Sequence, residues 1–281
     1  MQIDWSDFLV NHPHPIFVTG TQRSGTTLMC RMLAAHPNIY IKNEIPDARQ
    51  AFTEAVPEAI IEHISEQVAL TDIGNPLPTY LTNAEKTRWG LKDPLLTFCL
   101  PELADNFPTA KVIVMIRDGR AVSLSYMEQR WGAAANCYAG AQRWIEELKL
   151  QETFLSAHPN MALQVRYEDL LEDPSDVLCK ICSFIGEPYT EKMLEYSKAY
   201  TEIRKHQGNE NAFKPVDTSR AERWKGALSA RQIEVFEAVA GVKLQECGYT
   251  LEGQKRHKLS WIERSIFSAH NAYLTWINRQ L

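Results

Sequence analysis

The feature that most constrains the fold is a nearly unbroken apolar run, Ala110-Lys-Val-Ile-Val-Met-Ile116. A strand with one solvent-facing side alternates apolar and polar residues, whereas a parallel strand covered on both faces is apolar almost throughout. We therefore expect residues 110–116 to lie inside a parallel sheet. Because helical patterns separate the predicted strands, the sequence predicts an α/β fold with three layers, in which helices flank a mostly parallel central sheet. The other strands are predicted over residues 15–19, 39–42, 89–92 and 161–167.

The chain has 281 residues, which suits one large α/β domain. We predict this domain over residues 1–254 and an amphipathic helical tail over residues 255–281. The tail is expected to pack its apolar stripe on the domain or on a second copy in a homodimer, and peripheral membrane contact is the less favoured alternative. The stripe consists of Leu259, Ile262, Ile266, Tyr273 and Ile277. Helices are predicted over residues 26–35, 47–70 with a break near Pro57, 95–107, 118–130, 137–157, 170–185 and 229–247, and loops over residues 72–78 and 204–226.

A loop over residues 20–27, Gly-Thr-Gln-Arg-Ser-Gly-Thr-Thr, joins the first predicted strand to the first predicted helix. Its two glycines and the helix that follows have the skeleton of a P-loop, in which backbone N–H groups hold an anion. The ATP-binding form has a lysine where Thr26 stands, which argues against an ordinary kinase or NTPase. Arg23 supplies a positive charge instead and can donate a pair of hydrogen bonds to a sulfonate or phosphate. The loop therefore predicts an anion cradle, and a glycine turn capped by Ser and Thr is the alternative.

A second candidate anion site follows the strand over residues 110–116. Arg117 stands where that strand ends, and ligands of open α/β sheets bind beyond the carboxyl ends of the strands. Ser125 follows eight residues later on a predicted helix and can return toward the same edge. Two separate anion pockets predict one ligand with two anionic groups. A surface turn in which Arg117 pairs with Asp118 is the alternative.

These two elements resemble the sulfotransferases that use 3′-phosphoadenosine 5′-phosphosulfate (PAPS). Residues 15–33 resemble the 5′-phosphosulfate loop of that family, and residues 112–125 resemble its 3′-phosphate element. The more specific resemblance is to the tyrosylprotein sulfotransferases and related bacterial enzymes. It rests on the spacing from Arg23 to Glu44, on Lys92-Asp-Pro, on Arg117-Asp-Gly-Arg-Ala, on Tyr167-Glu-Asp and on Lys214-Pro-Val. Residues 45–88 and 130–160, which would face the acceptor, show no such match.

The resemblance implies a role for each matching residue. Glu44 would act as the general base for an acceptor hydroxyl, with Arg23 and Lys92 as the other catalytic residues. The donor-binding residues would be Arg23, Ser24, Gly25, Thr26, Thr27, Arg117, Ser125, Tyr167 and Lys214. The reaction would be an in-line transfer of the sulfuryl group from PAPS to a hydroxyl of a small molecule, glycan, lipid or peptide. A solvent-exposed acid in a loop is the alternative for Glu44.

Composition excludes several other classes of function. The net charge of −5 provides no basic field for nucleic acid, so no nucleic-acid partner is expected. The histidines and cysteines lack the spacing of a metal site, and no metal is expected. The N-terminus has neither the basic nor the apolar segment of a signal peptide, which predicts a cytoplasmic protein. A P-loop-type kinase or NTPase and a catalytically silent nucleotide-binding protein are the alternative functions.

Overall fold

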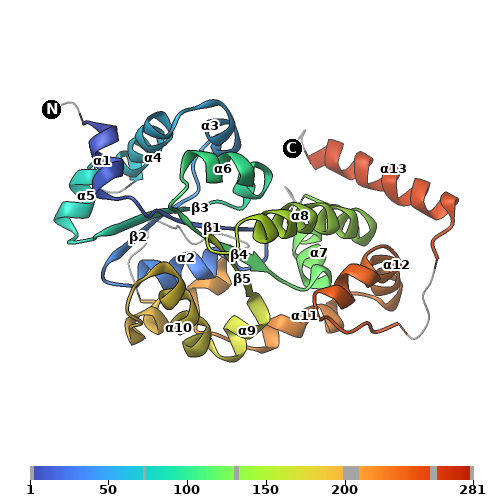
Figure 1. The fold of residues 1–281 in the computed structure, drawn as a ribbon. Coiled ribbons are helices and arrows are strands. Elements are labelled where there is room, and N and C mark those ends of the chain that lie inside the picture. The colour runs from blue at the N-terminus through green and yellow to red at the C-terminus, as the bar shows by residue number, and fades with distance from the viewer. Residues whose placement is uncertain (1–2, 72–73, 130–132, 199–208, 254–257, 279–281) are drawn as a thin grey trace. The chain divides into compact units, whose positions relative to one another are not determined.

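The computed structural model describes residues 3–71, 74–129, 133–198, 209–253 and 258–278 (Figure 1). The strands are β1 (Ile16–Gly20), β2 (Ile39–Asn43), β3 (Arg88–Lys92), β4 (Lys111–Ile116) and β5 (Ala162–Arg166). The α-helices are α1 (Trp5–Asn11), α2 (Thr26–Ala34), α3 (Ala48–Glu54), α4 (Pro57–Thr71), α5 (Leu77–Asn83), α6 (Leu100–Asn106), α7 (Gly119–Met127), α8 (Cys137–Ala157), α9 (Tyr167–Glu172), α10 (Pro174–Ile185), α11 (Ser219–Ala227), α12 (Ala230–Glu246) and α13 (Trp261–Asn278). Short 3₁₀ helices are η1 (Pro94–Cys99), η2 (Glu191–Glu195) and η3 (Glu210–Phe213).

The five strands form one parallel sheet in the order β2-β3-β1-β4-β5, which confirms the predicted fold class. β1 lies between β3 and β4, and Val18 pairs with Lys92 on one side and Ile113 on the other. All five residues of β1 are buried, as are all but the first of β4. The apolar character of β1 and β4 reflects a sheet covered on both faces. The polar loop that follows β1 therefore lies at the middle of the carboxyl edge of the sheet.

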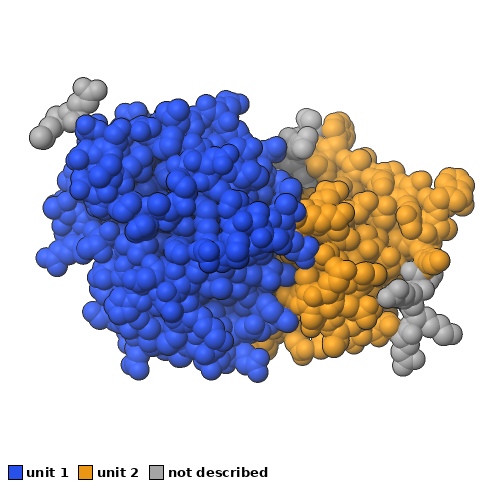
Figure 2. All heavy atoms as spheres, viewed as in Figure 1, with its two compact units in different colours: residues 1–116, 150–216 blue, residues 117–149, 217–281 orange. Residues whose placement is uncertain are grey.

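The described chain divides into two compact units (Figure 2). Unit 1 comprises residues 1–116 and 150–216 and contains the sheet. On one face of the sheet, Phe17 of β1 packs against Phe52 of α3 and Phe107, with ring centroids 5.6 and 5.4 Å apart. α2 and α10 cover the other face (Figure 1). This unit therefore has the three predicted layers.

Unit 2 comprises residues 117–149 and 217–281. The Trp144 ring lies 6.0 Å from Phe236 and 6.5 Å from Tyr249, measured between ring centroids. A Cβ atom at Gly119 would lie within 2.6 Å of both Trp144 and Phe236, so α7 begins on a glycine because the aromatic core leaves no room for a side chain. None of the described helices is long and apolar enough to span a membrane bilayer.

The predicted C-terminal tail contains the helix α13. This helix contacts the start of α8 through Phe267, whose ring stacks on Tyr138 at 5.9 Å, and through Asn271, which accepts the N–H of Ala135. Of the predicted apolar stripe, Leu259 is buried, whereas Ile262, Ile266 and Tyr273 are 51%, 59% and 61% exposed. Packing of the tail on the domain or on a second copy stays a prediction.

Several predicted boundaries are wrong for identifiable reasons. The single helix expected over residues 170–185 is two helices, because Asp173 caps a new one through the N–H of Asp176, and Pro174 is its first residue. The loop expected over residues 204–226 contains α11, anchored by the buried Trp224; residues 204–208 of that prediction lie outside the described residues. α1 and α5 were not predicted, since each is only seven residues long.

Candidate functional site

The loop between β1 and α2 is shaped by two glycines with positive φ. Gly20 has φ 137°, and a Cβ atom there would lie 2.2 Å from the carbonyl oxygen of Met115 in β4. Gly25 has φ 98°, and a Cβ atom would lie 2.4 Å from the ring of Tyr167. The predicted donor-contacting Tyr167 is thus packed directly against the loop. An L side chain at either glycine would clash as well as strain the backbone.

The interior of this loop carries a buried hydroxyl that lacks a partner. Ser24 is fully buried, and its Oγ has no hydrogen-bond partner within the described parts of the chain. Buried hydroxyls are nearly always paired, so an orphan one at a helix N-terminus fits an anion accepting its proton. Arg23 occupies the crown of the loop with φ 74°, an uncommon conformation for a side-chain-bearing residue. The residues present therefore fit a sulfonate or phosphate group.

Lys92 links this loop to the candidate base. It ends β3, and its side chain is 1% exposed. Its Nζ lies 3.5 Å from Oγ1 of Thr27 and donates a hydrogen bond to Oε1 of Glu44. The Glu44 side chain is 53% exposed, so the carboxylate is reachable from solvent while it is paired with a buried cation. The arrangement brings a carboxylate, an ammonium group and the loop after β1 into contact. The catalytic roles of Glu44 and Lys92 stay predictions.

The backbone around Glu44 is held by the same strand end. Glu44 has φ 52°, and its N–H donates to the carbonyl of Lys92 at 2.7 Å. Oδ2 of Asp93 accepts the N–H of Ile45 at 3.4 Å, and Oδ1 accepts the N–H of Leu95 at 2.9 Å. Asp93 belongs to the Lys92-Asp-Pro motif, and its carboxylate holds the turn after Glu44. Its signal in the sequence was its place between Lys92 and a proline, where an Asp caps a new helical turn.

Asp93 is 3% exposed, and desolvation raises its pKa to about 6; the nearby Glu44 charge adds to this, while the Leu95 N–H and Lys92 oppose it. In the unfolded chain the pKa of this carboxyl is 3.8. Between pH 3.8 and about 6 the Asp93 carboxyl is protonated in the folded state and ionised in the unfolded chain. The free energy of unfolding therefore falls as the pH rises through this window, by roughly 3 kcal/mol in total.

Asp93→Asn should remove that loss, because the amide cannot ionise. We expect the free energy of unfolding of D93N, relative to the wild type, to improve by about 3 kcal/mol between acidic and neutral pH. Denaturant titrations at a series of pH values measure this difference. Parallel stability profiles for the two proteins across the range would show that Asp93 titrates normally.

Beneath the loop lies a buried polar cluster that the sequence did not indicate. Oγ1 of Thr19 lies 3.1 Å from Oγ1 of Thr97, and Nε2 of Gln151 lies 3.4 Å from Oγ1 of Thr21. Gln151 is fully buried in the C-terminal part of α8, where helical periodicity gives no sign of a polar role. These contacts pair the hydroxyls of Thr19 and Thr21 on both sides of Gly20 and support the base of the loop.

Lys214, the last candidate in unit 1, is exposed and stands directly after η3. Its carbonyl oxygen accepts the hydroxyl proton of the buried Tyr196 at 2.6 Å. The backbone of Lys214 is thus tied to the body of unit 1 while its side chain faces solvent. A contact between that side chain and a donor nucleotide stays a prediction.

Arg117 and Ser125 belong to unit 2. Arg117 precedes α7, its Nη2 donates to the carbonyl of Arg220 at 3.1 Å, and its own carbonyl accepts the Trp144 indole N–H at 3.1 Å. Asp118 is buried, and its carboxylate receives a two-pronged pair of hydrogen bonds from Arg120 at 3.0 and 2.7 Å. The alternative of a solvent-exposed turn is therefore wrong. Ser125 is half-buried on α7, and its role in 3′-phosphate binding stays a prediction.

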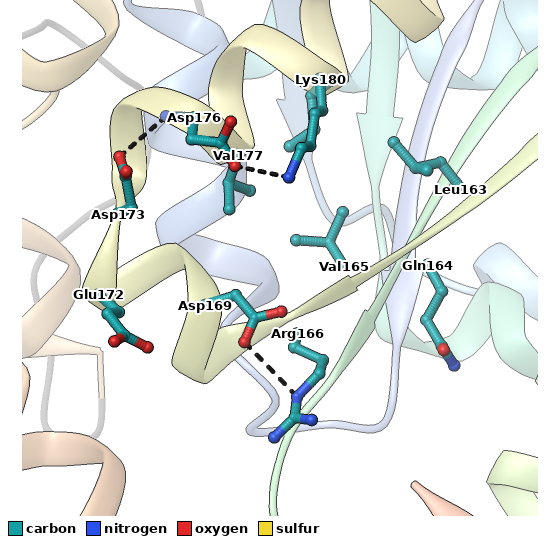
Figure 3. Close-up of a pocket in the computed structure, with 11 residues that line it drawn as sticks. Leu163, Gln164, Val165, Arg166, Asp169, Glu172, Asp173, Asp176, Val177 and Lys180 are labelled. Carbon is teal, nitrogen blue, oxygen red and sulfur yellow. Dashed lines mark hydrogen bonds and ion pairs between the residues drawn. The ribbon is translucent and has the colours of Figure 1, made fainter. Parts of the chain in front are cut away.

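A cavity of about 340 Å³ lies elsewhere in unit 1, between β5 and the helices α9 and α10 (Figure 3). Four carboxylates line it, and two of them are paired: Asp169 lies 3.7 Å from Arg166, and Asp176 lies 2.6 Å from Lys180. The other two carboxylates are Glu172 and Asp173. An acidic lining repels a dianion, and no predicted site residue lines this cavity, so it is not the candidate donor site.

Comparison with known proteins decides the family. A model described as the Sulfotransferase family matches residues 15–191, more than half of the chain. The chain belongs to the sulfotransferase family. This sulfotransferase is 25% identical over 273 residues to protein-tyrosine sulfotransferase 1 of Danio rerio, covering 86% of this chain and 74% of that protein. It is 26% identical over 268 residues to protein-tyrosine sulfotransferase A of Caenorhabditis elegans, covering 87% and 70% respectively.

The fold comparison agrees with the family. A sulfotransferase domain from the curacin biosynthetic pathway superposes with a TM-score of 0.63 at 21% identity, covering 85% of this chain and 99% of that domain. At this identity the likeness concerns the fold alone. The predicted enzyme class and α/β architecture are both confirmed, and the matched region contains the loop, Glu44, Lys92 and Tyr167.

Proposed function

We propose that this sulfotransferase transfers the sulfuryl group of PAPS to an acceptor hydroxyl, with Glu44 as general base. The observation that carries the proposal is the position of Lys92, whose ammonium group touches both Thr27 of the anion loop and Glu44. A transfer reaction needs a base for the nucleophile and a cation for the leaving oxygen, both within hydrogen-bond distance of the reacting group. The contacts of Lys92 with Thr27 and Glu44 support this assignment of roles.

The residues divide the chemistry as follows. Glu44 accepts the proton of the acceptor hydroxyl as its oxygen forms a bond to sulfur. Lys92 and Arg23 stabilise the negative charge that develops on the 5′-phosphate oxygen, which keeps the electron pair of the broken S–O bond. The hydroxyls of Ser24, Thr26 and Thr27 orient the phosphosulfate at the N-terminus of α2. PAPS supplies the activated sulfuryl group, and 3′,5′-adenosine bisphosphate (PAP) is the second product.

Arg117 and Ser125 would hold the 3′-phosphate, which distinguishes this donor from ATP. A thermal-shift titration tests the assignment: PAP should stabilise the protein clearly more than AMP or magnesium ATP. Preferential stabilisation by magnesium ATP would favour the kinase or NTPase alternative. Equal shifts for all three nucleotides would remove the PAPS assignment.

Arg117→Ala should weaken PAP binding about 10- to 100-fold and leave AMP binding nearly unchanged, because one charged hydrogen-bonding partner of the 3′-phosphate is lost. Calorimetric titration with both nucleotides measures the ratio of affinities. Arg223→Ala is the matched control, since it removes a guanidinium of the same unit that pairs with Glu128 at 3.0 Å on the surface. A wild-type preference for PAP that survives in R117A would assign 3′-phosphate binding to another residue.

The acceptor that we would test first is a tyrosine phenol, since both curated relatives above are named protein-tyrosine sulfotransferases. Transfer of labelled sulfate to tyrosyl peptides, simple phenols, alcohols, sugars and lipids would compare the acceptor classes directly. Transfer to sugars or lipids with none to phenols would exclude the tyrosine proposal and keep the donor chemistry. A cytoplasmic location stays a prediction.

A further inference from the structure

Arg31 is a buried cation on the helix that forms the anion loop. It lies in α2, which begins with Thr26 and Thr27, and it is 2% exposed. Its Nη2 donates to the carbonyl oxygens of Tyr196 at 2.8 Å and Ser197 at 3.4 Å. Its guanidinium also lies 4.0 Å from the ring centroid of Phe213. One side chain of the cradle helix thus holds two separate pieces of chain, one near residue 196 and one near residue 213.

Both pieces are connected to Lys214. Phe213 precedes it in the sequence, and the Tyr196 hydroxyl donates to its carbonyl at 2.6 Å. Tyr196 is 1% exposed, so its ring is fixed by packing and its hydroxyl is aimed by the same backbone that Arg31 holds. Arg31 is therefore connected to the Lys214 backbone in two ways. Its guanidinium contacts the ring of Phe213, the preceding residue, and it holds the backbone of Tyr196, whose hydroxyl donates to the Lys214 carbonyl.

A purely apolar side chain would fill this position at lower cost. Burial of a guanidinium sacrifices its hydration, and desolvation lowers the pKa of Arg31 accordingly. The planar guanidinium can stack on an aromatic ring and donate in its own plane at the same time, which neither lysine nor methionine can do. The geometry indicates that the position is used for orientation rather than for filling space.

We propose that Arg31 is a positioning residue for donor binding, which fixes the Lys214 segment to the helix whose N-terminus forms the anion loop. The inference rests on the proposed function, in which Lys214 contacts the nucleotide. Arg31 itself touches neither donor nor acceptor. Its effect on the reaction should pass entirely through residues 213 and 214.

A double-mutant cycle tests this route. Arg31→Met and Lys214→Ala should each weaken PAP binding roughly tenfold, and the double variant should bind no more weakly than K214A alone. In steady-state assays R31M should raise the KM for PAPS and leave kcat at saturating donor nearly unchanged. Effects of R31M and K214A that multiply in the double variant, or PAP affinity unchanged in R31M, would overturn the proposal.

Two further variants separate positioning from loss of fold. Tyr196→Phe removes only the hydroxyl that holds Lys214, so it should weaken PAP binding in the wild-type background and not in the K214A background. Arg49→Met is the matched control. Arg49 lies in α3, and its guanidinium is 5.6 Å from the ring centroid of Phe98. We expect R49M to leave PAP affinity unchanged. If R31M does not fold, an additive effect of Y196F on the K214A background overturns the inference by itself.

Hydrogen exchange provides a readout that does not require a nucleotide. Amides of residues 210–216 should exchange faster in R31M than in the wild type or R49M, because their anchor is lost. If the wild type shows no preference for PAP, the proposed function fails, and this measurement still decides whether Arg31 orders the segment. Unchanged exchange over residues 210–216 in R31M overturns the positioning role in either case.

Discussion

Glu44→Gln is expected to lower kcat by about 10²- to 10⁴-fold while PAP affinity stays within a factor of about two of the wild type. Glutamine preserves the size and the hydrogen-bonding partner of the side chain, but it cannot accept the acceptor proton. The N–H of Glu44 will still reach the Lys92 carbonyl, so the turn should keep its shape. Initial rates at saturating donor, together with calorimetric titration by PAP, measure both quantities.

Glu85→Gln is the matched control for this change. Glu85 is another exposed glutamate with positive φ, 54° compared with 52° for Glu44, and it lies outside the candidate site. We expect E85Q to retain full activity and donor affinity. If E44Q also retained its activity, Glu44 would not be the base. A loss of PAP binding equal to the loss of rate would instead give Glu44 a structural role.

Lys92→Met should lower kcat/KM for PAPS by about 10²- to 10³-fold, because it removes the cation that we propose stabilises the leaving phosphate oxygen. Methionine has a similar length and suits a buried position, so the fold should survive. The loss also removes the ion pair with Glu44. Rates at saturating and at limiting donor separate an effect on turnover from an effect on donor binding.

Lys42→Met controls for removal of a buried lysine from the same sheet. Lys42 is 3% exposed near the end of β2, and its Nζ donates to Oγ1 of Thr71 at 2.7 Å. The K42M variant should show a stability change with little loss of activity per folded molecule. Comparable activity losses in K42M and K92M would indicate that the rate depends on general sheet integrity rather than on the ammonium group of Lys92.

The strands and the loop could be predicted because their signals are local. A run such as Val112 to Ile116 can only be buried on both sides, and the glycines at positions 20 and 25 mark a turn whose φ values suit no other residue. Short helices were missed where tertiary contacts stabilise them. The Arg120 guanidinium stacks at 3.8 Å on Trp224, the buried residue of α11. The nine residues of this helix have no hydrophobic periodicity that would predict the contact.

Some residues of the candidate site could likewise be predicted from the sequence, and others could not. Arg23 could be named from the loop itself, and Glu44 and Lys92 could be named from their match to the motifs of the family that the sequence resembles. Gln151 and Arg31 could not be named, since their roles depend on partners that are distant in sequence. Gln151 and Thr97 are 54 residues apart, and Arg31 and Tyr196 are 165 residues apart.

By itself, the sequence determined the parallel α/β architecture through its hydrophobic runs and predicted the glycine loop after the first strand. The sulfotransferase class came from the resemblance of residues 15–33 and 112–125 to that family, and the family match over residues 15–191 confirms it. Hydrophobic runs and short motifs are both properties of neighbouring residues. Only the tertiary structure decided that Lys92 joins Thr27 to Glu44 and that Arg31 ties the Lys214 segment to the same helix. Such contacts form when the chain brings distant segments together in a buried environment, where an unpaired charge is so costly that each buried cation has to find its partners.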